Sequence, residues 1–192
     1  MKRHGFIFIF SCLFFPLFGQ NANSVFLYDT IYTTDGGQLL YRKLLPYNQQ
    51  VGEKYPLVLF LHGAGQRGSD NEKQLELGGD MFLNNRQNFS AFVLAPQCPS
   101  DNYWAFGTRP TAFSNASFPA NYDIVPIMVK VKELLDSYLS RSDVDLNRIY
   151  IVGLSMGAMG TYDMACRFPD IFAAAVPICG GVNIARLTGG VE

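Results

Sequence analysis

The clearest pattern in the chain is a set of short, continuous apolar runs separated by longer polar or amphipathic segments. The runs span residues 57–61, 91–95, 149–152 and 172–178. Apolar runs of this length, without polar alternation, are typical of strands that are buried on both faces of a sheet. We therefore expect four strands of a largely parallel sheet.

A hairpin is predicted ahead of these runs. Residues 25–32 and 38–45 are rich in β-formers, and Asp35-Gly36-Gly37 lies between them. An Asp-Gly pair between two such runs is a strong signal for a tight turn between antiparallel strands. The hairpin would add an antiparallel edge to the sheet.

Helical periodicity alternates with the predicted strands. Residues 122–140 carry apolar side chains at steps of three and four, and residues 156–168 continue as a helix until Pro169 stops it. Residues 70–83 form a weaker helical region that glycines interrupt. Strands alternating with helices indicate the α/β class, with one domain over residues 20–192.

The first 19 residues have the pattern of a secretory signal peptide. Lys2 and Arg3 precede a nearly unbroken apolar run over residues 6–18, which is too short to span a bilayer comfortably. We expect cleavage near Gly19 and a secreted or periplasmic product without a stable membrane span. Lipoprotein anchoring through Cys12 is the weaker alternative, because Phe10 fits that pattern badly.

Composition excludes several classes of function. The 192 residues are 48% hydrophobic and 16% charged, with a net charge of −1 and no basic run, so nucleic-acid binding has no support. Three cysteines follow the signal peptide, namely Cys98, Cys166 and Cys179. Their spacings do not match a zinc site, and we expect no metal and no organic cofactor. One disulfide would leave one free thiol, and the pairing stays open.

The candidate chemistry centres on Ser155. It lies in Gly153-Leu154-Ser155-Met156-Gly157, between a predicted strand and a predicted helix. A G-x-S-x-G sequence at a strand-to-helix turn is typical of a nucleophile elbow, whose glycines avoid clashes and whose serine is lifted clear of the sheet. Met156 would donate its backbone N–H to a developing oxyanion at the helix start.

A second oxyanion donor is predicted directly after the first buried strand. Leu61-His62-Gly63-Ala64-Gly65 places two glycines where the backbone must approach a substrate closely. The Ala64 N–H is our first choice as the donor and the Gly65 N–H the second. His62 is a candidate base, but its place at the strand end favours a structural role in bracing this loop.

An aromatic segment over residues 100–121 is the longest irregular stretch. It contains Tyr103, Trp104, Phe106, Phe113 and Phe118. Long loops on α/β scaffolds often bind substrate, and Trp104 is the candidate for lining an acyl or alcohol pocket. The alternative is that these rings pack the loop down as a satellite core, and the sequence does not choose between the two.

Several of these segments together resemble secreted α/β-hydrolase esterases of the poly(3-hydroxybutyrate) depolymerase, feruloyl esterase and phospholipase/carboxylesterase types. The elbow region resembles theirs over residues 145–157, the oxyanion loop over 62–68, and two further strand ends over 95–99 and 168–181. The resemblance covers about residues 25–185. It implies an eight-stranded α/β-hydrolase sheet, of which this chain accounts for about six strands.

The rest of a catalytic triad is missing from the sequence. In α/β-hydrolases an acid and then a histidine follow the serine along the chain. After Ser155 the only acids are Asp163, Asp170 and Glu192, and no histidine follows. Asp163 and Asp170 do not follow a later strand, as a triad acid should, so we expect a chain that is truncated before the acid-bearing and histidine-bearing strands.

The expected function is a serine ester hydrolase that works through an acyl-enzyme on Ser155. Its substrate would be a small or polymer-linked carboxylic ester, which the sequence does not specify further. The alternative is a non-catalytic binding protein, or an inactive fragment, of hydrolase descent.

Overall fold

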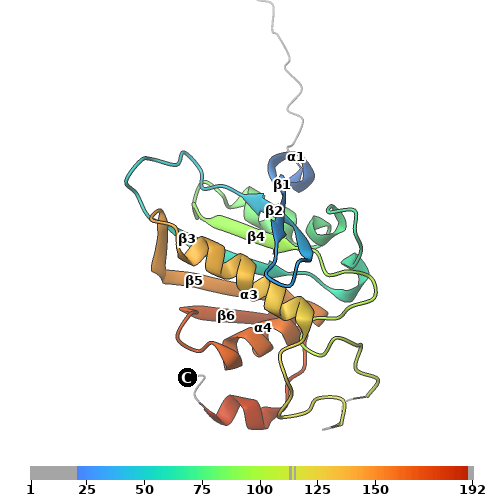
Figure 1. Cartoon of the computed structure of the whole chain (residues 1–192). Helices are drawn as coiled ribbons and strands as arrows, with labels where there is room; N and C mark the ends of the chain where they lie inside the picture. The colour runs from blue at the N-terminus through green and yellow to red at the C-terminus, as the bar shows by residue number, and fades with distance from the viewer. Residues whose placement is uncertain (1–20, 113, 115, 190–192) are drawn as a thin grey trace, which may run out of the picture.

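The structure, a computed structural model, describes residues 21–112, 114 and 116–189, so the predicted signal peptide lies outside the described residues. Six strands form one sheet (Figure 1). In chain order they are β1 (Leu27–Tyr32), β2 (Gln38–Leu44), β3 (Tyr55–Leu61), β4 (Phe92–Pro96), β5 (Val144–Leu154) and β6 (Ala174–Ile178).

The sheet has the mixed character that the sequence predicts. Its strand order is β1-β2-β4-β3-β5-β6, with β1 and β2 forming an antiparallel hairpin. Strand β2 pairs antiparallel with β4, and β4, β3, β5 and β6 run parallel to one another. Because the parallel strands share a direction, the loops after β3, β4, β5 and β6 all leave from one edge of the sheet, the carboxyl edge.

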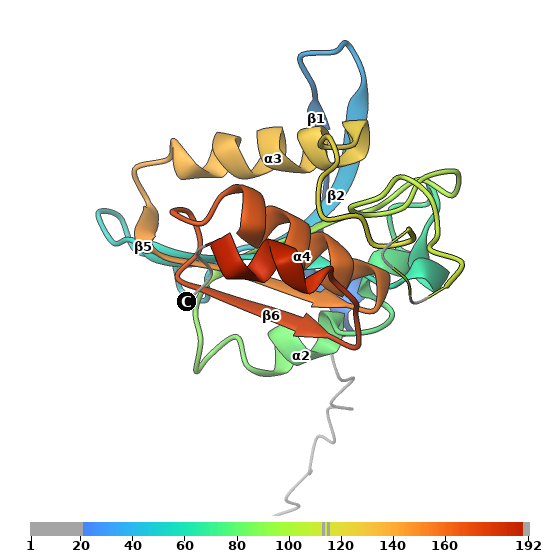
Figure 2. The ribbon, with the colours of Figure 1, turned by 90° about the horizontal axis from the view of Figure 1, so that it is seen from below.

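Helices cover both faces of the sheet. Figure 2 shows α3 (Pro126–Leu139) and α4 (Met156–Arg167) on one face and α2 (Gly79–Asn84) on the other. A short helix, α1 (Ala22–Val25), packs against α2 and was not expected from the sequence. None of the described helices is long and apolar enough to cross a bilayer.

Alternate residues of β3 enter two separate hydrophobic clusters. Leu57, Leu59 and Leu61 pack under α3 and α4, whereas Val58 and Phe60 pack under α1 and α2. All five side chains are 3% exposed or less. Burial on both faces explains why this strand is continuously apolar rather than alternating.

Two helix boundaries differ from the sequence prediction. Helix α3 begins at Pro126 rather than near Tyr122, because proline suits the first helical position and the residue before it, Val125, is extended. The weak region 70–83 is divided into the turn η2 (Lys73–Leu75) and α2, with Gly78 between them at φ 115°. A left-handed residue ends the helical path there.

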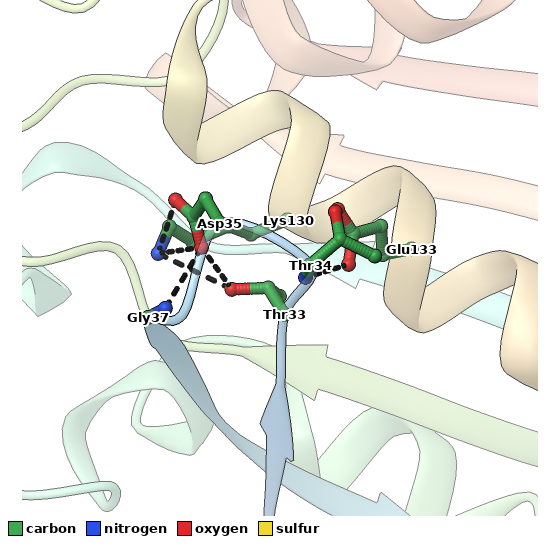
Figure 3. Close-up of polar contacts among 6 residues, drawn as sticks. All are labelled: Thr33, Thr34, Asp35, Gly37, Lys130 and Glu133. Carbon is green, nitrogen blue, oxygen red and sulfur yellow. Dashed lines mark hydrogen bonds and ion pairs between the residues drawn. The ribbon is translucent and has the colours of Figure 1, made fainter.

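The tip of the β1–β2 hairpin is held against α3 by polar contacts (Figure 3). The Thr34 N–H and hydroxyl donate to the Glu133 carboxylate at 2.9 and 2.6 Å. The Asp35 carboxylate accepts from the Thr33 hydroxyl and the Gly37 N–H and pairs with Lys130 at 3.0 Å, and these contacts lower the Asp35 pKa to about 2. The turn of the hairpin is therefore tied to α3.

Strand β6 forms the opposite end of the sheet, and its outer edge has no partner strand among the described residues. Val176 and Ile178 are 47% and 41% exposed. The sequence prediction of a strand buried on both faces is therefore wrong here, because α4 covers one face of β6 while alternate residues on the other face are exposed.

Candidate active site

Ser155 lies between the end of β5 and the start of α4, on the carboxyl edge. Its backbone has φ 55° and ψ −110°, and the residue is exposed. A positive φ in a residue with a Cβ is energetically unfavourable and is maintained only where surrounding structure imposes it. The Ser155 N–H donates to the Ile178 carbonyl at the end of β6 at 2.7 Å. The turn therefore holds the serine out toward solvent.

Two glycines make this turn sterically feasible. A Cβ on Gly157 would lie 1.8 Å from the Leu61 carbonyl oxygen, and a Cβ on Gly153 would lie 2.1 Å from the Gly157 carbonyl oxygen. Any other residue at either position would collide with backbone. The G-x-S-x-G spacing thus reflects close contact of β5 and α4 with the end of β3.

Met156 is the first residue of α4, so its N–H has no partner in the preceding turn of the helix. No other acceptor for this N–H lies within the described ranges. The Met156 side chain is fully buried. The backbone is therefore anchored while the N–H is available beside Ser155, where the positive end of the helix dipole favours negative charge.

The predicted oxyanion loop lies against the elbow. A Cβ built on Gly63 would lie 3.9 Å from the Ser155 Cβ, so the two segments nearly touch. Ala64 opens the short turn η1 (Ala64–Gln66), and Gly65 is exposed with open space around its Cβ direction. Among the described residues, neither the Ala64 nor the Gly65 N–H has a hydrogen-bond acceptor. Both can donate to a ligand.

His62 braces this loop, as the strand-end position indicated. It is 1% exposed, and its Nε2 accepts the Cys98 N–H at 3.0 Å, so its Nδ1 carries the proton and donates to the Gly63 carbonyl at 2.7 Å. Burial lowers its pKa to about 4. Because both ring nitrogens are engaged with backbone groups, His62 is not available as the base for Ser155.

Trp104 lies in the core. Its side chain is fully buried, its Nε1–H donates to the His62 carbonyl at 3.2 Å, and its Cβ would be 3.0 Å from a Cβ on Gly160 of α4. A role in lining a substrate pocket stays a prediction, and the position of the ring leaves it no exposed surface for that role. Tyr103 and Phe118 are also buried, so these rings favour the packing alternative. Phe113 lies outside the described residues.

Of the acids that follow Ser155, the two in the described residues do not form a triad with it, and Glu192 lies outside the described residues. Asp163 is fully buried on α4, where its Oδ1 accepts from Tyr122 at 2.7 Å, Arg167 at 2.8 Å and Arg186 at 2.9 Å. Asp170 is exposed in the turn after the helix. Asp163 therefore ties α4 to neighbouring segments.

The three described cysteines are free thiols, so the disulfide left open by the sequence is absent among them. Within the described part of the chain, no group of three His, Cys, Asp or Glu side chains could hold a metal ion.

Two further contacts of the elbow were not predicted from the sequence. One is the Ile178 carbonyl, and the other is Gly180, on which a Cβ would lie 2.4 Å from the Ala158 Cβ. In the sequence, only the pair Gly180-Gly181 after the last apolar run pointed to these contacts.

Comparison with known proteins finds similarity to a depolymerase and to esterases. No protein-family profile matches the chain. It is 32% identical over 132 residues to poly(3-hydroxyalkanoate) depolymerase C of Paucimonas lemoignei, covering 66% of this chain and 28% of that protein. It is 25% identical over 108 residues to acetylxylan esterase A of Emericella nidulans, covering 56% and 33%.

A solved structure described as a thermostable esterase superposes with a TM-score of 0.74 at 36% identity, covering 87% of this chain and 44% of that one. The sheet order, the elbow and these similarities identify an α/β-hydrolase fold. The chain spans less than half the length of each of these three relatives.

Proposed function

Because the chain has the α/β-hydrolase fold with a serine at its elbow, we propose that it is the nucleophile-bearing part of a serine carboxylic-ester hydrolase. One observation carries the proposal. Ser155 is exposed in a strained conformation, beside the unpaired N–H groups of Met156 and of the loop at Ala64. Such a grouping serves nucleophilic attack on a carbonyl, because it offers both a nucleophile and donors for the charge that develops.

In the proposed reaction, the Ser155 hydroxyl attacks the ester carbonyl and the N–H groups of Met156 and Ala64 stabilise the oxyanion. A general base takes the serine proton and returns it to the leaving alcohol, which yields an acyl-enzyme. Water then releases the acid by the same steps. His62 does not supply this base, so we assign the base to a histidine outside the 192 residues.

The names of the relatives indicate a broad class of substrate and no particular compound. Their names refer to a polyhydroxyalkanoate and to acetylated xylan, both polymers that carry carboxylic esters. We propose a polymer-linked or small carboxylic ester, hydrolysed without a metal or organic cofactor. We further propose that residues 1–19 direct the protein to the periplasm or the exterior, with lipid anchoring at Cys12 as the less favoured route.

A second candidate is a non-catalytic binding protein of hydrolase descent. The observation in its favour is that the sequence contains only His4 and His62, and both nitrogens of His62 are occupied. Such a protein would bind esters at the same edge without turning them over.

Hydrolysis of p-nitrophenyl acetate by two polypeptides separates the candidates. One is the 192-residue chain, and the other is the gene product including any coding sequence that follows codon 192. We expect the longer product to be active, and the short chain to be slower by a factor of about 10⁴ or more, since the serine would lack its base.

Ser155→Ala in the longer product should lower kcat by a similar factor, with Ser137→Ala, a serine on α3, as the matched control. Robust, Ser155-dependent turnover by the short chain would refute the requirement for a further histidine. An inactive longer product that still binds esters would favour the binding protein.

A further inference from the structure

One charged side chain joins the oxyanion loop to the loop that follows β4. The Arg67 Nε donates to the Ala64 carbonyl at 3.0 Å, and one terminal nitrogen donates to the carbonyls of Asn102 at 2.9 Å and Ser100 at 3.1 Å. The guanidinium also lies 5.6 Å from the Tyr103 ring centre. The planar fork of arginine suits this arrangement, because several donors act from one rigid group.

The bond to the Ala64 carbonyl bears on a second peptide of the oxyanion loop. In a planar trans peptide, the carbonyl and the following N–H point in opposite directions. Holding the Ala64 carbonyl therefore fixes where the Gly65 N–H points. His62 acts in the same way one peptide earlier, because it holds the Gly63 carbonyl and so orients the Ala64 N–H.

Little else holds this second peptide. Among the described residues, one backbone bond closes the turn, from the Gln66 N–H to the Gly63 carbonyl at 3.2 Å. The Gly68 N–H bonds to the Cys98 carbonyl beyond the turn, at 2.9 Å. Arg67 thus supplies the direct contact with the Ala64–Gly65 peptide, and its charge strengthens that bond and polarises the peptide.

The geometry points to Arg67 as a positioning residue that holds the Ala64–Gly65 peptide so that the Gly65 N–H serves as a further oxyanion donor beside that of Ala64. The inference rests on the proposed ester hydrolysis. Arg67 acts through the loop and does not contact the substrate itself. In the sequence, Arg67 lies within the 62–68 segment that resembles an oxyanion loop, and the sequence alone indicated no role for it.

Arg86 provides a matched control at the other end of the parallel strands. Its Nε donates to the Leu45 carbonyl at 3.1 Å, a terminal nitrogen contacts the Pro46 carbonyl at 3.4 Å, and its guanidinium lies 5.8 Å from the Tyr47 ring centre. Leu45 directly follows Leu44, which pairs with Val93 near the amino end of β4. Arg86 therefore makes contacts similar to those of Arg67, but at the edge of the sheet opposite the elbow.

The first test is hydrogen exchange at the Gln66 and Gly68 amides, which does not require activity. Arg67→Met should speed exchange at both amides about tenfold, because the loop then opens more often. Arg67→Lys should restore part of the protection, and Arg86→Met should leave both amides unchanged. Unchanged exchange in Arg67→Met would overturn the proposal.

The second test is kinetic and uses the longer gene product with p-nitrophenyl acetate. Arg67→Met should lower kcat by about 10- to 100-fold with KM changed less than about twofold, since a misdirected donor acts in the transition state. Faster exchange with unchanged kcat would also overturn the positioning role. If the unaltered product has no activity, the proposed function fails, and hydrogen exchange alone still accepts or rejects Arg67 as the tether of this loop.

Discussion

The two flanks of β5, the strand that leads to Ser155, differ in how fully their groups are buried and hydrogen-bonded. On the β3 side, Gly157 packs directly on the Leu61 carbonyl and the buried His62 bonds through both ring nitrogens. On the β6 side, the Ile178 carbonyl fixes the Ser155 N–H, but the strand beyond it exposes Val176 and Ile178. One flank is closed by backbone and buried polar contacts, and the other is open.

This difference separates two parts of the chemistry. The closed flank carries the groups that would stabilise an oxyanion, and these are backbone N–H groups held by packing. The open flank is an edge at which a further parallel strand carrying the proposed base could pair with β6, the outermost described strand on this side of Ser155. Electrostatic stabilisation and proton transfer would therefore come from different portions of the polypeptide.

The largest effect is expected at the closest contact of the closed flank. Gly157→Ala places a methyl group 1.8 Å from the Leu61 oxygen, so backbone must move. We expect a loss of at least about 3 kcal/mol in the free energy of unfolding, or failure to fold. Gly65→Ala is the control, because its Cβ has nothing within 4 Å, and it should change this free energy by less than about 0.5 kcal/mol. Equal effects in urea denaturation would contradict the assigned contact.

The next effect is a pH dependence of stability that originates at His62. Its pKa is about 4 in the folded protein, compared with about 6.5 when unfolded. The unfolded chain therefore binds the proton first as pH falls, and stability is lost between about pH 6.5 and pH 4. The loss should be about 3 kcal/mol between pH 7 and pH 4.

His62→Gln removes the titrating group while retaining polar contacts. Urea denaturation of both proteins at pH 7, 5.5 and 4 should show a flatter profile for the variant, whatever its stability at pH 7. Parallel profiles would mean that His62 is not buried in its neutral form.

The smallest effect on stability is expected at the open flank, where solubility should change instead. Val176→Lys in the 192-residue chain should leave the free energy of unfolding within about 0.5 kcal/mol, while raising the concentration at which the chain aggregates. Leu146→Lys, at a residue that is 60% exposed on β5, serves as the control and should have less effect on aggregation. Equal aggregation of Val176→Lys and the unaltered chain by light scattering would show that the β6 edge does not drive association.

Most of the fold could be predicted from local pattern. The continuous apolar runs located β3, β4 and β5, and the Asp-Gly signal located the β1–β2 turn, because these features depend on burial and turn geometry within a few residues. The start of α3 was predicted too early. The apolar periodicity of the sequence continues upstream of Pro126 to Ile124, but the helical backbone begins only at Pro126. The exposure of β6 depends on its place at the sheet edge, which its own composition does not reveal.

The site was predictable where the backbone itself forms it. G-x-S-x-G and the glycines of the 62–68 loop indicate tight turns, and the structure brings these two segments together. The sequence does not decide the role of Trp104, because an aromatic residue in a long loop gives the same pattern whether its ring faces substrate or core. Arg67 carried no signal of its own, since its bonds go to carbonyls more than 30 positions away as well as to Ala64.

The most direct test of the central claim is the site of covalent modification by a fluorophosphonate, read by intact mass and peptide mapping of the longer gene product. We predict one phosphonyl group per chain, located on Ser155, and no adduct in Ser155→Ala. The 192-residue chain should react far more slowly at the same serine. Modification at another residue, or equal modification of Ser155→Ala, would contradict the assignment of Ser155 as the nucleophile.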